Sequence, residues 1–168
     1  MKLKRDQTTL LRMKKKNKKK ILITGSKGFI GYHLKENLKH NYELFVPDKI
    51  KLNLKNKSKL KNYIDKLQPD FIINLVSSTK FKKDFKKEKY NQSINTFLTN
   101  KNLVDAINKN CKLVIFFGSI EEYGKCKLPY SEKMQPKPRS LYGKYKYKSY
   151  LYTKKKLKKK KNKNYLIN

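Results

Sequence analysis

Three glycines spaced three residues apart follow a short apolar run near the start of the chain. Residues 21–24 read Ile-Leu-Ile-Thr, and Gly25, Gly28 and Gly31 come after them. An apolar run that ends in glycine predicts a buried β-strand, and the apolar residues that follow recur at helical spacing. The pattern predicts a tight strand-to-helix turn. In such a turn Gly25 permits the reversal, Gly28 lets the backbone approach a pyrophosphate, and Gly31 allows helix and strand to pack closely.

The remainder of the chain alternates between strand-like and helix-like stretches. The expected strands cover residues 21–24, 42–46, 71–76 and 113–117, with a fifth opening at 165–167, and the expected helices cover 29–38, 60–67, 94–107 and 142 onward. We expect residues 80–90 to form a loop or an exposed helix start, and the lysine-rich stretch 154–164 to form a solvated helix face in preference to a disordered link. The alternation predicts a Rossmann-like, doubly wound parallel sheet in a three-layer α/β/α arrangement.

One α/β domain accounts for the length of 168 residues. We place it at residues 20–168, after a basic, disordered extension at residues 1–19. Two cysteines, Cys111 and Cys126, are too few for a disulfide framework or a metal site, so we expect no metal and a reducing, cytoplasmic location. No stretch approaches the ~18 apolar residues of a membrane span, and we expect no membrane association.

The formal net charge is +33, from 45 Lys and Arg against 12 Asp and Glu. Such a balance is typical of proteins that bind nucleic acid or an anionic membrane. Base readout favours arginine, however, and the only arginines are Arg5, Arg12 and Arg139, whereas lysines are spread along the whole chain. The charge therefore indicates no specific nucleic-acid partner.

Asp48 stands at the end of the second expected strand, directly after Pro47. A carboxylate at this position can accept hydrogen bonds from both ribose hydroxyls of NAD, although an exposed turn residue is the alternative. Lys49 follows it and can instead attract the 2′-phosphate of NADP. The choice between NAD and NADP stays open.

The Thr-Gly-x-x-Gly-Phe-Ile-Gly form of the glycine loop resembles the extended short-chain dehydrogenase/reductases, the NAD-dependent epimerase/dehydratase family. Four further segments resemble that family in the same order: residues 68–78, the helix that carries Asn95, residues 117–124 with Ser119, and Tyr142-Gly143-Lys144-Tyr145-Lys146. The resemblance covers roughly residues 20–168. It implies NAD or NADP as the cofactor, a nucleotide-sugar substrate, and Tyr142, Lys146 and Ser119 as catalytic residues. The cofactor-binding residues that it implies are Gly25, Ser26, Gly28, Phe29, Ile30, Gly31, Asp48, Leu75, Val76, Ser77, Asn95, Tyr142 and Lys146.

The chemistry of the Tyr142–Lys146 pair follows from its spacing, because residues four apart share a helical face. A lysine ammonium beside a phenol favours phenolate, and use of a tyrosine near pH 7 requires a shift of about 3 pH units from its ordinary value of ~10. The tyrosine then exchanges a proton with a sugar hydroxyl or carbonyl while a hydride moves. Tyr150 and Lys154 have the same spacing, so the Ser119 segment and the glycine loop are what single out Tyr142.

Several residues depart from the family pattern. Asn74 replaces the usual histidine, Ser77-Ser78 replace small alanines, and Tyr145 stands where a small serine is common. Ile120 occupies the position where the dehydratase branch keeps an acid. The resemblance therefore favours 4-keto reduction or C4 epimerisation over dehydration.

Family members run to about twice this length, so the resemblance implies that the C-terminal substrate domain is missing. We expect exposed apolar surface where that domain would pack. The alternative to an enzyme is a catalytically inactive NAD(P)-binding fragment or subunit that pairs with another chain. A homodimer is also expected to be possible.

Overall fold

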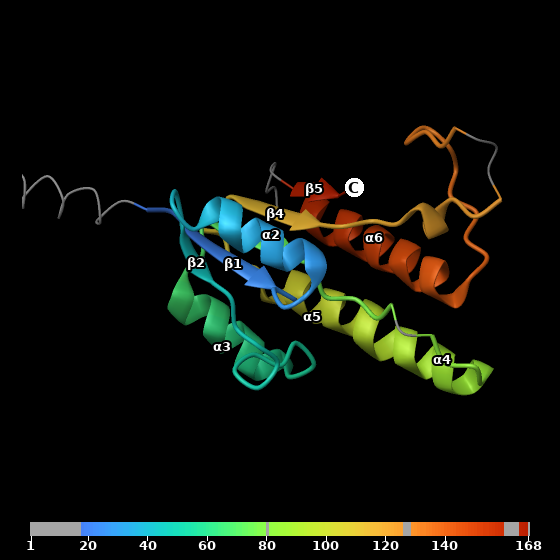
Figure 1. The fold of residues 1–168 in the computed structure, drawn as a ribbon, viewed down its shortest axis with the longest axis horizontal. Helices are drawn as coiled ribbons and strands as arrows, with labels where there is room; N and C mark the ends of the chain where they lie inside the picture. Colours follow the sequence, from blue (N-terminus) through green and yellow to red (C-terminus); the bar gives the residue numbers. More distant parts are fainter. Residues whose placement is uncertain (1–17, 80, 126–128, 160–164, 168) are drawn as a thin grey trace, which may run out of the picture.

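The computed structural model describes residues 18–79, 81–125, 129–159 and 165–167 (Figure 1). Most of the predicted 1–19 extension lies outside them. The strands are β1 (Lys20–Thr24), β2 (Glu43–Phe45), β3 (Phe71–Asn74), β4 (Leu113–Phe116) and β5 (Tyr165–Ile167). The helices are α2 (Phe29–Leu38), α3 (Lys57–Leu67), α4 (Phe85–Gln92), α5 (Thr99–Ala106) and α6 (Leu141–Lys159), with a π-helical turn η1 (Ser93–Leu98) between α4 and α5 and a 3₁₀ helix η2 (Ile120–Glu122) after β4.

The strands form one parallel sheet in the order β2-β1-β3-β4-β5. The chain runs from β1 out to β2 and then returns to β3 on the other side of β1. The helices that follow β1 and β3 in such a sheet lie on opposite faces of it. Because the two connections diverge, a crevice opens between them at the carboxyl ends of β1 and β3. The predicted Rossmann-like, doubly wound fold is confirmed.

Helices cover both faces of the sheet, as predicted (Figure 1). The inward side chains of one face, including Leu22, Ile72 and Val114, pack in a core with residues of α3, α5 and α6. Ile21, Ile23 and Ile73 point to the opposite face and pack with residues of α2. Each such side chain contributes about 1.5–3 kcal/mol when it is fully buried, so these two cores fix the position of the crevice between them.

The α2 face is covered less completely at β4. Val114 and Phe116, which face α5 and α6, are buried, whereas the alternate residues Leu113 and Ile115 are only partly buried. Phe117, the next residue, keeps 39% of its surface exposed. Apolar surface is therefore accessible on this side of the sheet.

The structure decides between the two alternatives for one segment and differs from the expectation at another. Residues 80–90 contain the start of α4, which is capped by Asp84, and this fits the exposed helix start rather than a loop. The single helix expected over residues 94–107 is divided into η1 and α5. The lysine-rich stretch is helical to Lys159 within α6, and the rest of it lies outside the described residues.

Among the described helices, none combines the length and the apolar character that a bilayer crossing requires.

Candidate active site

The three glycines lie at the β1–α2 crossover, and each has a different steric environment. Gly25 adopts φ +76°, and a β-carbon there would lie 3.0 Å from the Leu75 carbonyl carbon. A β-carbon on Gly31 would lie 2.6 Å from the Ser26 α-carbon, so α2 packs directly on the turn. At Gly28 the nearest atom would be 3.6 Å away, which leaves the space above this glycine open.

The N-terminus of α2 is left without a side-chain cap. Gly28 is its N-cap residue, and within the described residues no side chain accepts its first N–H groups and no acid lies in its first turn. By contrast, the side chains of Asn56 and Asp84 cap α3 and α4. Unpaired N–H groups and the positive end of the helix dipole are the groups that bind a phosphate.

Two adjoining cavities open at the carboxyl ends of the strands, with volumes of about 620 and 560 Å³. Every residue predicted to bind the cofactor lines at least one of them. The first cavity is lined by Phe29, Ile30, Gly31, Leu75, Tyr142 and Lys146, and the second by Ser26, Asp48 and Asn95. Both cavities are lined by Gly25, Gly28, Val76 and Ser77. The cavities therefore meet at the glycine turn and at the segment that follows β3.

Asp48 is held at the rim of the second cavity. One carboxylate oxygen accepts the Lys51 N–H at 2.9 Å, and the other lies 3.5 Å from the ammonium of Lys27. These contacts, the backbone N–H first, lower the pKa of Asp48. Lys49 and Lys55 line the same cavity, so both a carboxylate and several ammonium groups face this end of the groove.

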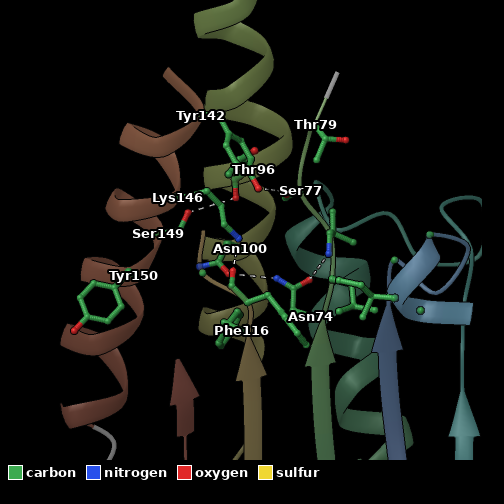
Figure 2. A pocket seen from close by; sticks show the side chains of 18 of the residues that line it. Asn74, Ser77, Thr79, Thr96, Asn100, Phe116, Tyr142, Lys146, Ser149 and Tyr150 are labelled. Atoms are coloured by element: carbon green, nitrogen blue, oxygen red, sulfur yellow. Dashed lines mark hydrogen bonds between the residues drawn. The ribbon is translucent and has the colours of Figure 1, made fainter. Parts of the chain in front are cut away.

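Tyr142 and Lys146 project from α6 into the first cavity, one turn apart (Figure 2). The Tyr142 hydroxyl lies 3.3 Å from the Ser77 hydroxyl. The Lys146 ammonium donates a hydrogen bond to the Phe117 carbonyl oxygen. Burial lowers the pKa of Lys146, and the nearby Glu122 carboxylate partly opposes this effect. The predicted Tyr–Lys pair thus shares one cavity with the glycine turn.

Ser119 has other contacts in this structure. Its hydroxyl accepts the Glu121 N–H at 3.3 Å, and its own N–H is bound by the Glu122 carboxylate at 2.9 Å. Ser119 and Glu122 form a capping box at the start of η2. Ser119 lines neither cavity, and the described residues show no hydrogen bond between it and Tyr142. Its catalytic role stays a prediction.

The segment that carries Ser119 nevertheless packs tightly on the first turn of α6. Ser140 caps α6 by accepting the Gly143 N–H at 3.0 Å and donates to the Glu121 carboxylate at 2.7 Å. A β-carbon on Gly143 would lie 2.2 Å from the Glu121 carbonyl oxygen. The position of Tyr142 is therefore set by η2 as well as by its own helix.

Buried polar residues form part of the lining of the first cavity. Of these only Asn74 was singled out from the sequence, as a departure from the family pattern. Asn74 donates a hydrogen bond to Asn100 at 3.3 Å (Figure 2). Asn74 also accepts a hydrogen bond from Thr24 at 2.7 Å, and Asn100 donates to Thr153 at 3.0 Å. Glu122 is also buried in this wall, and burial raises its pKa. The sequence does carry a signal for such a polar face. Gln92, Thr96 and Asn100 recur every four residues, and residues four apart share a helical face.

Comparisons with known proteins found a family model and solved structures that are similar to this chain. The model of the NAD dependent epimerase/dehydratase family matches residues 21–166. The chain is similar to dTDP-4-dehydrorhamnose reductase from Bacillus anthracis, solved with NADP, at 24% identity and a TM-score of 0.78, over 90% of this chain and 52% of that chain. The enzyme of the same description from Yersinia enterocolitica matches at 26% identity and a TM-score of 0.76, over 89% and 51% of the two chains.

An epimerase shares the fold as well. UDP-glucose 4-epimerase from Brucella ovis, solved with NAD, matches at 20% identity and a TM-score of 0.77, over 89% of this chain and 50% of that chain. At 20% identity, and equally at the 24% of the Bacillus anthracis enzyme, the likeness shows the fold alone. The present chain spans about half the length of each of these three structures.

Proposed function

The chain belongs to the NAD-dependent epimerase/dehydratase family, and on that basis we propose that it binds NAD or NADP across its two cavities and transfers hydride and proton on a nucleotide-linked sugar. The observation that carries the proposal is the joint lining of these cavities by the glycine turn, Asp48, Tyr142 and Lys146. The reaction type proposed is 4-keto reduction or C4 epimerisation, because Ile120 supplies no acid for dehydration.

The groove fits a dinucleotide in its polarity as well as in its position. Its middle is formed by Gly28 and the uncapped N-terminus of α2, which suit a diphosphate. The Asp48 side suits an adenosine ribose, with Lys27 and Lys49 close to a 2′-phosphate if one is present. The Tyr142 side is left for the nicotinamide. The similar structures solved with NADP or NAD support a dinucleotide as the ligand of the groove.

The dinucleotide, when bound, supplies or accepts the hydride. Tyr142 gives its hydroxyl proton to the substrate oxygen in reduction and takes it back in oxidation. Lys146 lies one turn further along α6, so its ammonium stabilises the phenolate electrostatically and holds the nicotinamide ribose. Ser119 is proposed to support Tyr142 after a change of its capping contacts.

Binding is tested by thermal unfolding with and without each dinucleotide. NAD or NADP at saturating concentration is expected to raise the melting temperature, since a ligand that binds only the folded state stabilises it. Gly28→Asp should abolish the shift, because a carboxylate would occupy the open space over the glycine and repel a diphosphate. Asn41→Asp is the matched control: it adds the same charge in an exposed turn before β2, at the other end of the sheet. No shift with either dinucleotide would defeat the proposal.

One observation favours a second function, a catalytically inactive NAD(P)-binding subunit that pairs with another chain. The β4 residues Leu113 and Ile115 are only partly buried and leave apolar surface accessible on the α2 face. If this alternative holds, dinucleotide binds and any activity of the assembly is the same with Tyr142→Phe as with the unchanged chain. A large loss with Tyr142→Phe supports the enzyme instead.

A further inference from the structure

Two consecutive glutamates after β4 have different surroundings. Glu121 is exposed, and its carboxylate accepts a hydrogen bond from Ser140 at 2.7 Å. Glu122 is only 7% exposed, and it lines the first cavity, which Glu121 does not. The Glu122 carboxylate accepts the Ser119 N–H at 2.9 Å. The interior of the site therefore contains a carboxylate that the reaction proposed above does not use.

Lys146 approaches the same segment from α6. Its ammonium donates to the carbonyl oxygen of Phe117, two residues before the Ser119 N–H that Glu122 binds. Lys146 and Glu122 also line the same cavity. Burial raises the pKa of Glu122, and the Ser119 N–H and the Lys146 ammonium partly oppose this shift. The two side chains thus hold neighbouring points of the segment after β4, and each one lies within the field of the other's charge.

A helix cap alone does not account for a buried carboxylate at Glu122. The third residue of a capping box acts by accepting a backbone N–H, and a glutamine performs this task as a glutamate does. A carboxylate that is removed from water costs free energy unless a positive charge compensates it. Among the described residues, Lys146 is the cation whose charge acts on Glu122. The burial of Glu122 therefore indicates the role of a counter-ion.

The rest of the described cavity lining carries no further charge at neutral pH. Its ionisable side chains are Glu122, Tyr142, Lys146 and Tyr150. The residues that α2, the segment after β3, η1 and α5 contribute to this lining are all uncharged. Glu122 and Lys146 are therefore the two charges that this lining presents to the phenol of Tyr142.

We infer that Glu122 is a positioning residue of the proposed reaction, and that its carboxylate is the counter-ion that keeps Lys146 protonated and directed toward the end of β4. This inference rests on the proposed function. Glu122 acts through Lys146 and does not contact the reacting atoms. A neutral amine at Lys146 would no longer stabilise the Tyr142 phenolate, so the carboxylate extends the pH range over which the Tyr142–Lys146 pair works.

A double-mutant cycle tests the pair without any cofactor. The free energies of unfolding at pH 7 are measured for the unchanged chain, Glu122→Gln, Lys146→Met and the double variant. Either single change leaves one charge without its partner, so the double variant should lose less than the sum of the two. Glu43→Gln paired with Lys146→Met is the control cycle and should be additive, because Glu43 is exposed at the amino end of β2. Additivity in the Glu122 cycle would overturn the inference.

The pH dependence of reduction tests the role, with NADH or NADPH and a nucleotide-linked 4-keto sugar. Glu122→Gln keeps an acceptor for the Ser119 N–H and removes the charge. The alkaline midpoint of kcat should move to lower pH by about 1 pH unit, the low end of the effect of a nearby opposite charge. The direction is the same whether Lys146 or Tyr142 sets this midpoint. Loss of the carboxylate makes the ammonium easier to deprotonate and the phenolate easier to form.

Two further variants separate charge from shape. Glu122→Asp keeps the charge on a shorter side chain, so its alkaline midpoint should return most of the way to that of the unchanged chain. Glu43→Gln removes the same charge at the opposite end of the sheet from the cavities and should leave the midpoint unchanged. Below the midpoint, Glu122→Gln should change the dinucleotide KM little, because Lys146 is still charged there. An unchanged midpoint in Glu122→Gln, or an equal shift in Glu43→Gln, would overturn the inference.

The outcomes separate the two proposals. Failure of the unchanged chain to bind either dinucleotide, or to turn over the sugar, would defeat the proposed function and, with it, the positioning role of Glu122. Dinucleotide binding and turnover together with an additive Glu122 cycle would defeat only the inference. A coupled cycle with an unchanged alkaline midpoint would also defeat only the inference, because the pair would then support the fold and not the reaction.

Discussion

Gly143 lies against the Glu121 carbonyl so closely that a β-carbon on the glycine would be 2.2 Å from that oxygen. The contact joins the first turn of α6 to η2, between the two members of the Tyr142–Lys146 pair. Only a residue without a side chain allows this approach, because the neighbouring atom belongs to the backbone and cannot rotate away. The distance between the Ser119 segment and the Tyr142 helix therefore depends on this glycine.

Gly143→Ala is expected to push η2 and α6 apart. Inserting a methyl group against backbone costs about 1–3 kcal/mol, so the free energy of unfolding should fall by about that amount in denaturant titrations. Lys144→Ala, at the next and exposed position of α6, is the control and should change stability little. Equal stability of Gly143→Ala and the unchanged chain would show that the two segments can separate at no cost.

The fold could be predicted from the sequence because its signals are local. The apolar runs at residues 21–24 and 71–76 are short and continuous, as in strands that are covered on both faces. The glycine spacing after the first run then located the turn at the topological switch point. Every predicted cofactor-binding residue lines the groove. The loop residues among them follow from where the strands end, whereas Asn95, Tyr142 and Lys146 were predicted from the family resemblance.

The surroundings of Ser119 show why the catalytic residues were harder to predict. Ser119-Ile120-Glu121-Glu122 has the Ser-x-x-Glu spacing of a capping box, and the same serine fits the family's active-site segment. The local signal and the resemblance compete, and the structure without ligands adopts the capping box. A pattern in one segment cannot show which side chain a distant tyrosine meets.

Other parts of the site depend on contacts between distant segments. The hydrogen bonds from Thr24 to Asn74 and from Asn100 to Thr153 join residues about fifty positions apart. The π-helical turn η1 changes the helical period over only six residues, which is too short to alter an apolar pattern. Such details arise from tertiary packing and are not visible in periodicity.

Gly31 and Gly28 should respond differently to the same substitution. Gly31→Ala places a β-carbon 2.6 Å from the Ser26 backbone and should lower the free energy of unfolding by about 1–3 kcal/mol. Gly28→Ala meets nothing closer than 3.6 Å and has an ordinary negative φ, so stability should be nearly unchanged. Its dinucleotide affinity should fall instead, because the methyl group occupies the path of the diphosphate. Denaturant titration and dinucleotide titration of both variants distinguish these effects, and normal affinity of Gly28→Ala would contradict close approach at this position.

Asp70 gives the fold a pH-dependent stability. Its carboxylate accepts the Lys20 N–H at 3.0 Å and the Lys112 ammonium at 3.0 Å, and these contacts, the backbone N–H first, lower its pKa from 3.8. Because the pKa of Asp70 is lower in the folded chain than in the unfolded chain, its carboxylate stabilises the fold at pH values above the pKa of the unfolded chain. This contribution is lost as the pH falls through the pKa that Asp70 has in the folded chain. Asp70→Asn should therefore cost about 1 kcal/mol at pH 7 and nothing at the acid end of the stability curve.

Asp65→Asn provides the matched control for Asp70. Asp65 pairs with Lys61 on the exposed face of α3, where ion pairs contribute about 0.3–0.5 kcal/mol. The loss at pH 7 should be smaller than for Asp70→Asn and should shrink in high salt. A pH-independent deficit in Asp70→Asn would mean that side-chain shape, rather than charge, supports the junction of β1, β3 and β4.

Cys111 offers a measurement of dinucleotide binding that does not depend on catalysis. The residue is 5% exposed, its thiol donates to the Leu113 carbonyl oxygen, and burial raises the pKa of the thiol to about 11. Thiolate is the reactive form, so at pH 8 the native thiol should be alkylated at least about two orders of magnitude more slowly than a free cysteine. Reaction then proceeds mainly through opening of the fold.

In a Cys126→Ser background, saturating NAD or NADP should slow the alkylation further, by a factor of about one plus the ratio of ligand concentration to Kd, because opening must release the ligand first. Two outcomes would contradict this expectation: fast alkylation of the native chain, or an alkylation rate that the dinucleotide does not change although the dinucleotide raises the melting temperature. Either outcome would show that the reagent reaches the thiol through a local motion of β4 that leaves the groove intact.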